Sequence, residues 1–115
     1  VATQATLEAL FGGQAAAKVL LFIRNYGEGY ASWISKTFEM PVSEVQTQLK
    51  KFEEAGVLVS RMVDTSRIYT WNPRDPALVG LQQLLQSSLD YGFPEERLKK
   101  YFRQRRRPRR KGKSL

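Results

Sequence analysis

The hydrophobic pattern changes its period once between residues 30 and 73, and this change constrains the fold more than any other feature of the sequence. The first half carries apolar residues at helical intervals, interrupted by a polar turn at 39–41: Ile34, Phe38, Met40, Val45, Leu49 and Phe52. The second half carries two runs rich in β-branched and aromatic residues, 58–63 and 67–71, which flank the turn Asp64-Thr65-Ser66. The pattern predicts two helices packed across a tight turn and followed directly by a short β-hairpin.

The start and the end of the second helix carry their own signals. Pro41 fits the first turn of a helix, where its missing N–H would have no partner. Ser43 with Gln46 three residues later fits a capping box, so we expect the helix to begin between residues 42 and 44. Gly56 fits a left-handed cap at the other end, after Ala55.

Further helices are predicted on both sides of this pair. Apolar surface on most sides of residues 14–25 predicts a buried helix. The first helix of the pair is expected at 31–38, with Trp33 half exposed and Tyr30 forming a one-residue bridge to the hairpin. Residues 77–91 and 94–102 read as two more helices, closed by Gly92 and opened by Pro94 respectively. The fold class is therefore mainly α with a small β-hairpin.

Positive charge is concentrated at one end of the chain. Residues 1–96 hold 8 Lys/Arg and 11 Asp/Glu, a net charge of −3, whereas residues 97–115 hold 11 basic and no acidic residues, which gives the total of +8. The heart of this segment, residues 103–113, is too charged and too poor in apolar residues to form a core. One interpretation is a general tether, a localisation signal or a solubilising tail. The other is an arm that tracks phosphates or enters a minor groove of DNA. The second interpretation assigns DNA contacts to Arg103, Arg105, Arg106, Arg107, Arg109, Arg110, Lys111 and Lys113.

The length of 115 residues suits one domain with an appendage. We expect a domain at 1–91 with flanking helices, and a short helix plus basic tail at 92–115. No apolar run approaches the roughly 20 residues that cross a bilayer, and the first residues lack the pattern of a signal peptide. Together with the absence of Cys, this predicts a cytoplasmic protein without membrane contact.

The sequence contains no His and no Cys. It therefore offers no imidazole base, no thiol nucleophile and no conventional zinc site. The acidic residues are scattered, or adjacent on helices where neighbours point in different directions. We therefore expect a protein that is not an enzyme and has no cofactor or metal.

The run from Tyr30 to Leu58 resembles the prokaryotic winged helix-turn-helix transcriptional regulators of the ArsR-like and MarR-like superfamily. The segment LKKFEEAGVL at 49–58 is similar to the end of the recognition helix in those proteins. The resemblance covers about residues 7–73 and implies a winged helix-turn-helix with flanking C-terminal helices. Glu39 stands where these proteins commonly have Gly, Glu44 puts an acid at the helix start, and the tip of the wing lacks a basic residue. The Cys and His ligands of ArsR-type metal sensors are absent, so metal sensing is not expected.

The resemblance also implies which residues would contact DNA. Base-facing positions fall on Val42, Ser43, Gln46, Thr47 and Lys50. Phosphate contacts fall on Ser32 and Lys36 in the preceding helix, and wing contacts fall on Arg61 and Arg67.

The leading hypothesis is thus a sequence-specific regulator that binds double-stranded DNA, with a small-molecule or protein effector still to be identified. Two alternatives remain: a winged-helix adaptor or antitoxin-like module that binds a protein, and an RNA-binding protein that uses the Arg-rich tail. A homodimer is expected, because the apolar stripe of Leu78, Leu81, Leu85 and Leu89, with Leu7, Leu10 and Phe11, exceeds what one such domain needs to cover.

Overall fold

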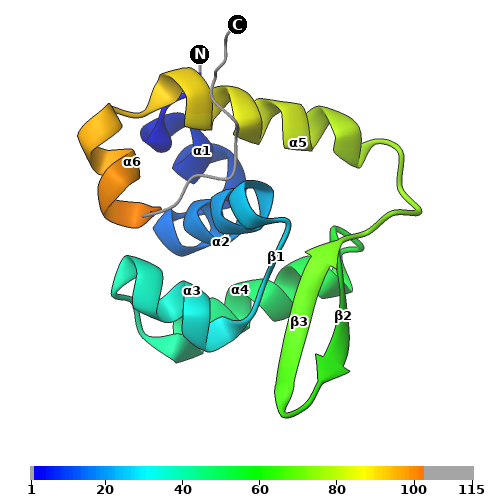
Figure 1. The fold of residues 1–115 in the computed structure, drawn as a ribbon. Helices are drawn as coiled ribbons and strands as arrows, with labels where there is room; N and C mark the ends of the chain where they lie inside the picture. Colours follow the sequence, from blue (N-terminus) through cyan, green and yellow to red (C-terminus); the bar gives the residue numbers. More distant parts are fainter. Residues whose placement is uncertain (1, 103–115) are drawn as a thin grey trace, which may run out of the picture.

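The computed structural model describes residues 2–102, so the predicted tail contacts at 103–113 lie outside the described residues. This part of the chain is mostly helical and carries a small three-stranded antiparallel sheet (Figure 1). Its elements are, in order, α1 (Gln4–Phe11), α2 (Gln14–Tyr26), β1 (Glu28–Gly29), α3 (Ala31–Phe38), α4 (Val42–Glu54), β2 (Leu58–Val63), β3 (Ser66–Trp71), α5 (Leu78–Ser87), the π-helical turn η1 (Ser88–Gly92) and α6 (Glu95–Tyr101).

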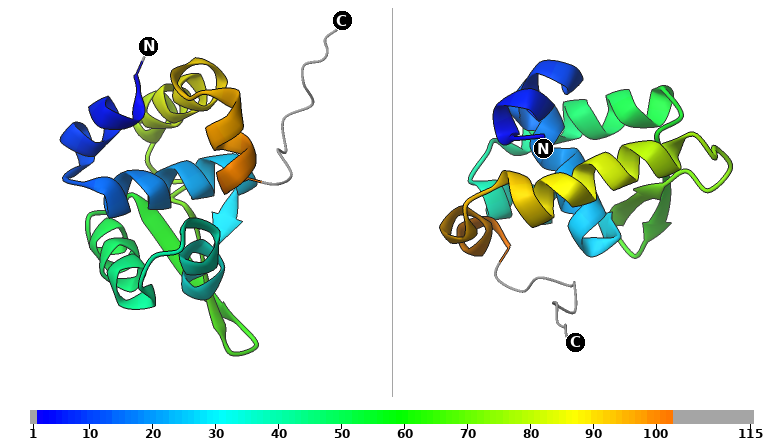
Figure 2. Two further views of the ribbon diagram at one scale, coloured as in Figure 1. Left: turned by 90° about the vertical axis from the view of Figure 1, so that its left-hand side faces the viewer. Right: turned by 90° about the horizontal axis from the view of Figure 1, so that it is seen from above.

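Helix α2 forms the centre of the core, as its apolar composition predicts. Val19, Phe22 and Ile23 are fully buried. The helix contacts α1, α3, α4 and α5, and the ribbon views show it between α5 on one side and the α3–α4 pair on the other (Figures 1 and 2). The predicted buried helix is confirmed and extends to Tyr26.

The turn between α3 and α4 holds Glu39 in a left-handed conformation, with φ of +56°. This conformation costs a residue with a Cβ about 1–2 kcal/mol relative to the right-handed form. Two hydrogen bonds hold the turn: the Met40 N–H donates to the Ser35 carbonyl at 3.0 Å, and the Ser35 hydroxyl donates to the Met40 carbonyl at 2.5 Å. Glu39 is therefore a strained residue that the packing of the turn holds in place.

The bounds of α4 agree with prediction, but the predicted capping box is wrong. The helix begins at Val42 after Pro41, and no side chain caps its start. Ser43 is already inside the first turn, where its carbonyl accepts a hydrogen bond from the Thr47 hydroxyl at 2.9 Å. At the other end Gly56 is left-handed, with φ of +83°, as predicted.

The sheet has the strand order β1-β3-β2. The hairpin pairs Leu58 with Trp71 and Val63 with Ser66, so its loop consists of Asp64 and Thr65, and Ser66 belongs to β3 rather than to the predicted turn. β1 is a two-residue strand at Glu28–Gly29, which replaces the bridge predicted at Tyr30. A Cβ at Gly29 would lie 2.9 Å from the Phe22 ring, so the close packing of β1 on α2 requires glycine there.

The C-terminal helices complete the same core. Leu85 and Leu89 are buried together with Phe93, Leu98 and Phe102 in the cluster that contains α2. The helix predicted at 77–91 ends earlier, at Ser87, and continues as the π-helical turn η1. Residues on both sides of 91–92 thus contribute to one buried cluster, and the leucine stripe that suggested a dimer is largely buried within the chain.

Within residues 2–102, no single helix has the length and apolar composition to cross a membrane. α1 and α2 pass such a test only as a pair with a 110° bend between them, and α2 is the buried core helix.

Candidate nucleic-acid interface

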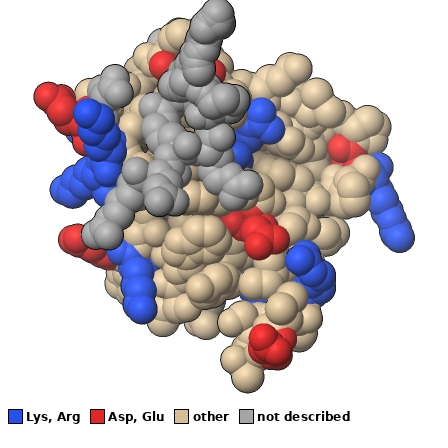
Figure 3. Space-filling view, viewed as in Figure 1, with Lys and Arg blue, Asp and Glu red and all other residues tan. Residues whose placement is uncertain are grey.

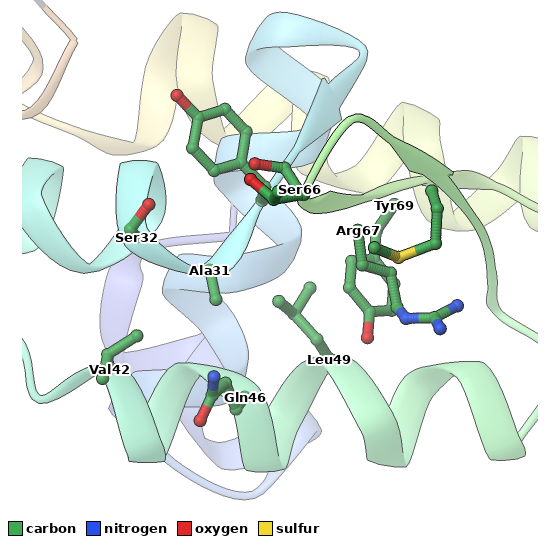
Figure 4. Close-up of a pocket in the computed structure, with 11 residues that line it drawn as sticks. Ala31, Ser32, Val42, Gln46, Leu49, Ser66, Arg67 and Tyr69 are labelled. Carbon is green, nitrogen blue, oxygen red and sulfur yellow. The ribbon is translucent and has the colours of Figure 1, made fainter.

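A cleft of about 500 Å³ separates the starts of α3 and α4 from the inner face of the hairpin (Figure 4). The helices contribute Tyr30, Ala31, Ser32, Val42, Gln46 and Leu49, and the hairpin contributes Met62, Thr65, Ser66, Arg67 and Tyr69. Four residues predicted to contact DNA therefore lie around one cleft: Ser32, Val42, Gln46 and Arg67. We call it the α4–hairpin cleft.

The amphipathic pattern of α4 determines which of its residues are exposed. Val45, Leu49 and Phe52 are buried against the core. Ser43, Gln46, Thr47 and Lys50 lie on the exposed side, since a rotation of 100° per residue turns them away from the buried stripe. Because the Thr47 hydroxyl hydrogen is used on the Ser43 carbonyl, its oxygen remains available only as an acceptor.

A hydrogen-bonded chain orients Arg67 in the cleft. The Arg67 Nη1 donates to the Ser60 Oγ at 3.0 Å, and the Ser60 hydroxyl donates to Glu53 Oε2 on α4 at 2.6 Å. Ser60 thereby joins both strands of the hairpin to α4. Burial, followed by the negative charge of Glu53, raises the pKa of the neighbouring Tyr69, and the positive charge of Arg67 opposes this shift.

Arg61 lies on the other face of the hairpin. It pairs with Ile68 across the strands, whereas Arg67 pairs with Met62, and successive residues of a strand point to opposite faces. Its guanidinium is 3.7 Å from the Glu28 carboxylate on β1, and both side chains are about half exposed. The structure thus separates the two arginines that were predicted to act together.

Lys36 is also separated from the cleft. It lines a second groove, between α3 and α6, together with Tyr26, Trp33, Thr37, Glu39, Lys100 and Tyr101. The predicted site residues therefore divide between the α4–hairpin cleft, the outer face of α4, the outer face of the hairpin and the groove beside α6.

Several cleft residues were missed by the sequence analysis, chiefly Tyr30, Met62 and Tyr69. Met62 is 54% exposed although it is apolar. Strand alternation could have placed Met62 on the inner face of the hairpin, because Ser60 and Met62 share a face with Leu58, an apolar residue that is expected to point toward the core. Tyr30 had no such signal, since its position depends on the close approach of β1 to β3.

The described body has no net charge to attract a polyanion. Eight of the 19 basic residues lie at 103–113, which leaves 11 basic residues against 11 acidic ones in residues 2–102. Glu39, Glu44 and Asp64 are exposed near the α3–α4 turn, the start of α4 and the tip of the hairpin. Within the same part of the chain, no group of three or more His, Cys, Asp or Glu side chains could hold a metal ion.

Comparison with known proteins gives no match to this chain, either among the models of protein families or among curated proteins.

Proposed function

We propose that this chain is a winged helix-turn-helix protein that binds double-stranded DNA in a sequence-specific manner and regulates transcription. In this proposal α3 and α4 form the helix-turn-helix, and β2 and β3 form the wing. α4 enters the major groove, which is wide enough to admit an α-helix. The wing then lies beside α4 against the DNA backbone.

The exposed polar face of α4 is the observation that carries the proposal. Ser43, Gln46, Thr47 and Lys50 are exposed on one side of the helix, and Val42, its first residue, is 43% exposed. A Gln side chain can pair with the major-groove edge of adenine, and the methyl groups of Thr and Val fit the thymine methyl. The Lys50 ammonium can donate hydrogen bonds to a guanine or pair with a phosphate.

The residues around this face supply contacts to the backbone. Ser32 is exposed at the start of α3, and Arg67, which is held by a hydrogen bond to Ser60, lines the same cleft as Gln46. The hydrogen bond from Arg67 to Ser60 leaves other guanidinium N–H groups for a phosphate, because arginine has five donors. Arg61 has a smaller part in this arrangement, since it lies on the far face beside Glu28.

The basic tail supplies most of the electrostatic attraction in the proposal, because the described body is neutral. Each phosphate that a basic side chain neutralises releases counterions, and this gain does not depend on sequence. The tail would therefore hold the protein on DNA while α4 distinguishes one site from another. We place this activity in the cytoplasm of a prokaryotic cell, where such regulators meet DNA.

The test is a selection from a library of random duplex DNA with the full-length protein, followed by sequencing of the bound fraction. The expected result is a short enriched motif containing A·T pairs at the positions that face Gln46 and Thr47. Salt-dependent binding without an enriched motif would contradict sequence-specific recognition. Preferential binding to a structured RNA, or a 1:1 complex with an acidic protein that duplex DNA does not disturb, would favour the RNA-binding or adaptor alternative.

A further inference from the structure

A row of basic side chains crosses the side of the molecule formed by α2, α3 and α6. The groove between α3 and α6 contains Lys36 and Lys100, and it adjoins a second hollow that contains Lys18 and Arg97. Both hollows share Lys100 and Tyr101, so they form one surface. Figure 3 shows Lys and Arg side chains along the left edge of the molecule, near α6 and α3, with acidic side chains beside them. We call Lys18, Lys36, Arg97 and Lys100 the basic strip.

The strip carries a net positive charge, which the rest of the described surface lacks. It contains four basic residues and is bordered by two acidic ones, Glu39 and Glu96. Since residues 2–102 hold equal numbers of basic and acidic residues, the remaining described surface has a net charge of −2. The strip is therefore the basic region of an otherwise slightly acidic body.

Packed aromatic rings line this surface, and one of its cations, Lys18, lies over them. Tyr26 packs on Trp33 with ring centroids 4.9 Å apart, and Phe38 packs on Tyr101 at 5.0 Å. The Lys18 ammonium lies 5.7 Å from the Phe38 ring centroid and 5.5 Å from that of Tyr101, which is cation–π distance. These contacts limit the positions of the Lys18 ammonium and so reduce the entropy lost when it binds a ligand.

We infer that the basic strip is a second DNA contact, which binds the phosphates that flank the base pairs read by α4. This inference rests on the proposed function. Ser32 lines the α4–hairpin cleft and Lys36 lines the strip, and the two residues are one helical turn apart on α3. The strip thus begins next to the proposed major-groove contact.

The strip ends at α6, and its extended shape favours a long polyanion over a small anion. α6 carries Arg97 and Lys100 and leads directly to the eight basic residues at 103–113. The cations are spread along two adjoining hollows that share only Lys100 and Tyr101, as repeated phosphates require, rather than gathered in a single hollow around one point. The strip therefore connects α3 to the start of the tail along one duplex.

The test compares two double variants of the full-length protein with equal loss of charge. Lys36→Gln with Lys100→Gln removes two exposed cations of the strip. Lys51→Gln with Lys99→Gln is the control, because Lys99 is exposed next to Lys100 outside both hollows and Lys51 is directed toward the Phe11 carbonyl on α1. Glutamine keeps the helix propensity of lysine, and thermal unfolding of each variant checks the fold.

Binding is measured against salt concentration on two duplexes, one that covers only the selected motif and one extended by about ten base pairs on each side, roughly one helical turn. On the long duplex the strip variant should reduce the slope of log K against log salt by about 1.8, since each phosphate contributes about 0.9. It should have little effect on the short duplex and leave the ratio between selected and random long duplexes unchanged. The control should change the slope by less than half as much.

Equal slopes for the strip variant and the control, or equal losses on the short and long duplexes, would overturn the inference. Either result can occur with intact sequence preference, so it is distinct from failure of the proposed function. If the wild type shows no sequence preference, but the strip variant still lowers the salt slope more than the control on random duplex, recognition by α4 is overturned and the strip inference stands.

Discussion

Ser60 has a larger structural role than its size suggests. Its hydroxyl accepts from Arg67 and donates to Glu53, so one side chain connects β2, β3 and α4. This arrangement fixes the angle between the hairpin and α4 and orients the Arg67 charge along the α4–hairpin cleft. It also places the Glu53 carboxylate near the buried Tyr69, which lies directly across the strands from Ser60.

The raised pKa of Tyr69 predicts a loss of stability in alkaline solution. Above pH 10, about the pKa of an unperturbed tyrosine, the unfolded chain releases the Tyr69 proton more readily than the folded protein does. The contribution of Tyr69 to the free energy of unfolding is therefore complete below pH 10, and it declines as the pH rises toward the pKa of Tyr69 in the folded protein. Urea unfolding midpoints from pH 8 to 11 should fall less steeply for Tyr69→Phe than for the wild type. Tyr91→Phe, at a side chain 73% exposed, is the control and should follow the wild type; a Tyr69→Phe variant that also follows it would contradict the assignment.

At the scale of single elements, the sequence predicted what local periodicity encodes. The bounds of α3, α4 and β2 follow from apolar spacing, and the end of α4 follows from the glycine that can adopt a left-handed conformation at 56. β1 was not predicted as a strand, because two residues have no periodicity and its pairing partners lie about 40 residues away. The π-helical turn η1 was missed for a similar reason. Ser88 is buried there and donates a hydrogen bond to the Ala2 carbonyl at 2.7 Å, a contact with a residue 86 positions earlier in the chain.

The surroundings of two glycines predict opposite effects on stability when each is replaced by alanine. A Cβ at Gly92 would clash with the Ala2 carbonyl oxygen, so Gly92→Ala should destabilise the protein by about 1–3 kcal/mol through the forced backbone shift. Gly80 lies in α5 with open space around it, so Gly80→Ala should stabilise the protein by about 1 kcal/mol through helix propensity. Chemical denaturation measures both. A neutral Gly92→Ala would show that residues 2–3 do not pack tightly on η1.

At the scale of the whole molecule, the fold distributes the predicted site residues over several surfaces. Arg61 and Arg67 were both predicted as wing contacts, but strand alternation places them on opposite faces of the hairpin. Ser32 and Lys36 were both predicted as phosphate contacts; they lie one helical turn apart on α3 but line two different hollows. The packing of the whole molecule also bears on the predicted homodimer. Leu7, Leu85 and Leu89 are buried within the chain, so the dimer remains a prediction without its main argument.

The neutral charge of residues 2–102 predicts that the tail dominates the affinity for DNA. Deleting residues 103–115 removes eight basic residues, and if six of them neutralise phosphates, the slope of log K against log salt should fall by about 5. Affinity should drop for all sequences alike, while the ratio between selected and random duplexes changes much less. Fluorescence anisotropy over a series of salt concentrations measures both quantities. An unchanged slope would assign the tail to a partner other than DNA.

The central claim is that the exposed face of α4 distinguishes between DNA sequences. The most direct test is the ratio of affinities for the selected and a scrambled duplex, measured at one salt concentration for the wild type and for Gln46→Ala with Thr47→Ala. Each good base contact is worth about 1–3 kcal/mol, so the ratio should fall by at least about tenfold while the unfolding midpoint stays near that of the wild type. Gln83→Ala, at an exposed position of α5, should leave the ratio unchanged. A stable double variant that keeps the full ratio would contradict the claim, because α4 would then not be the element that reads the DNA.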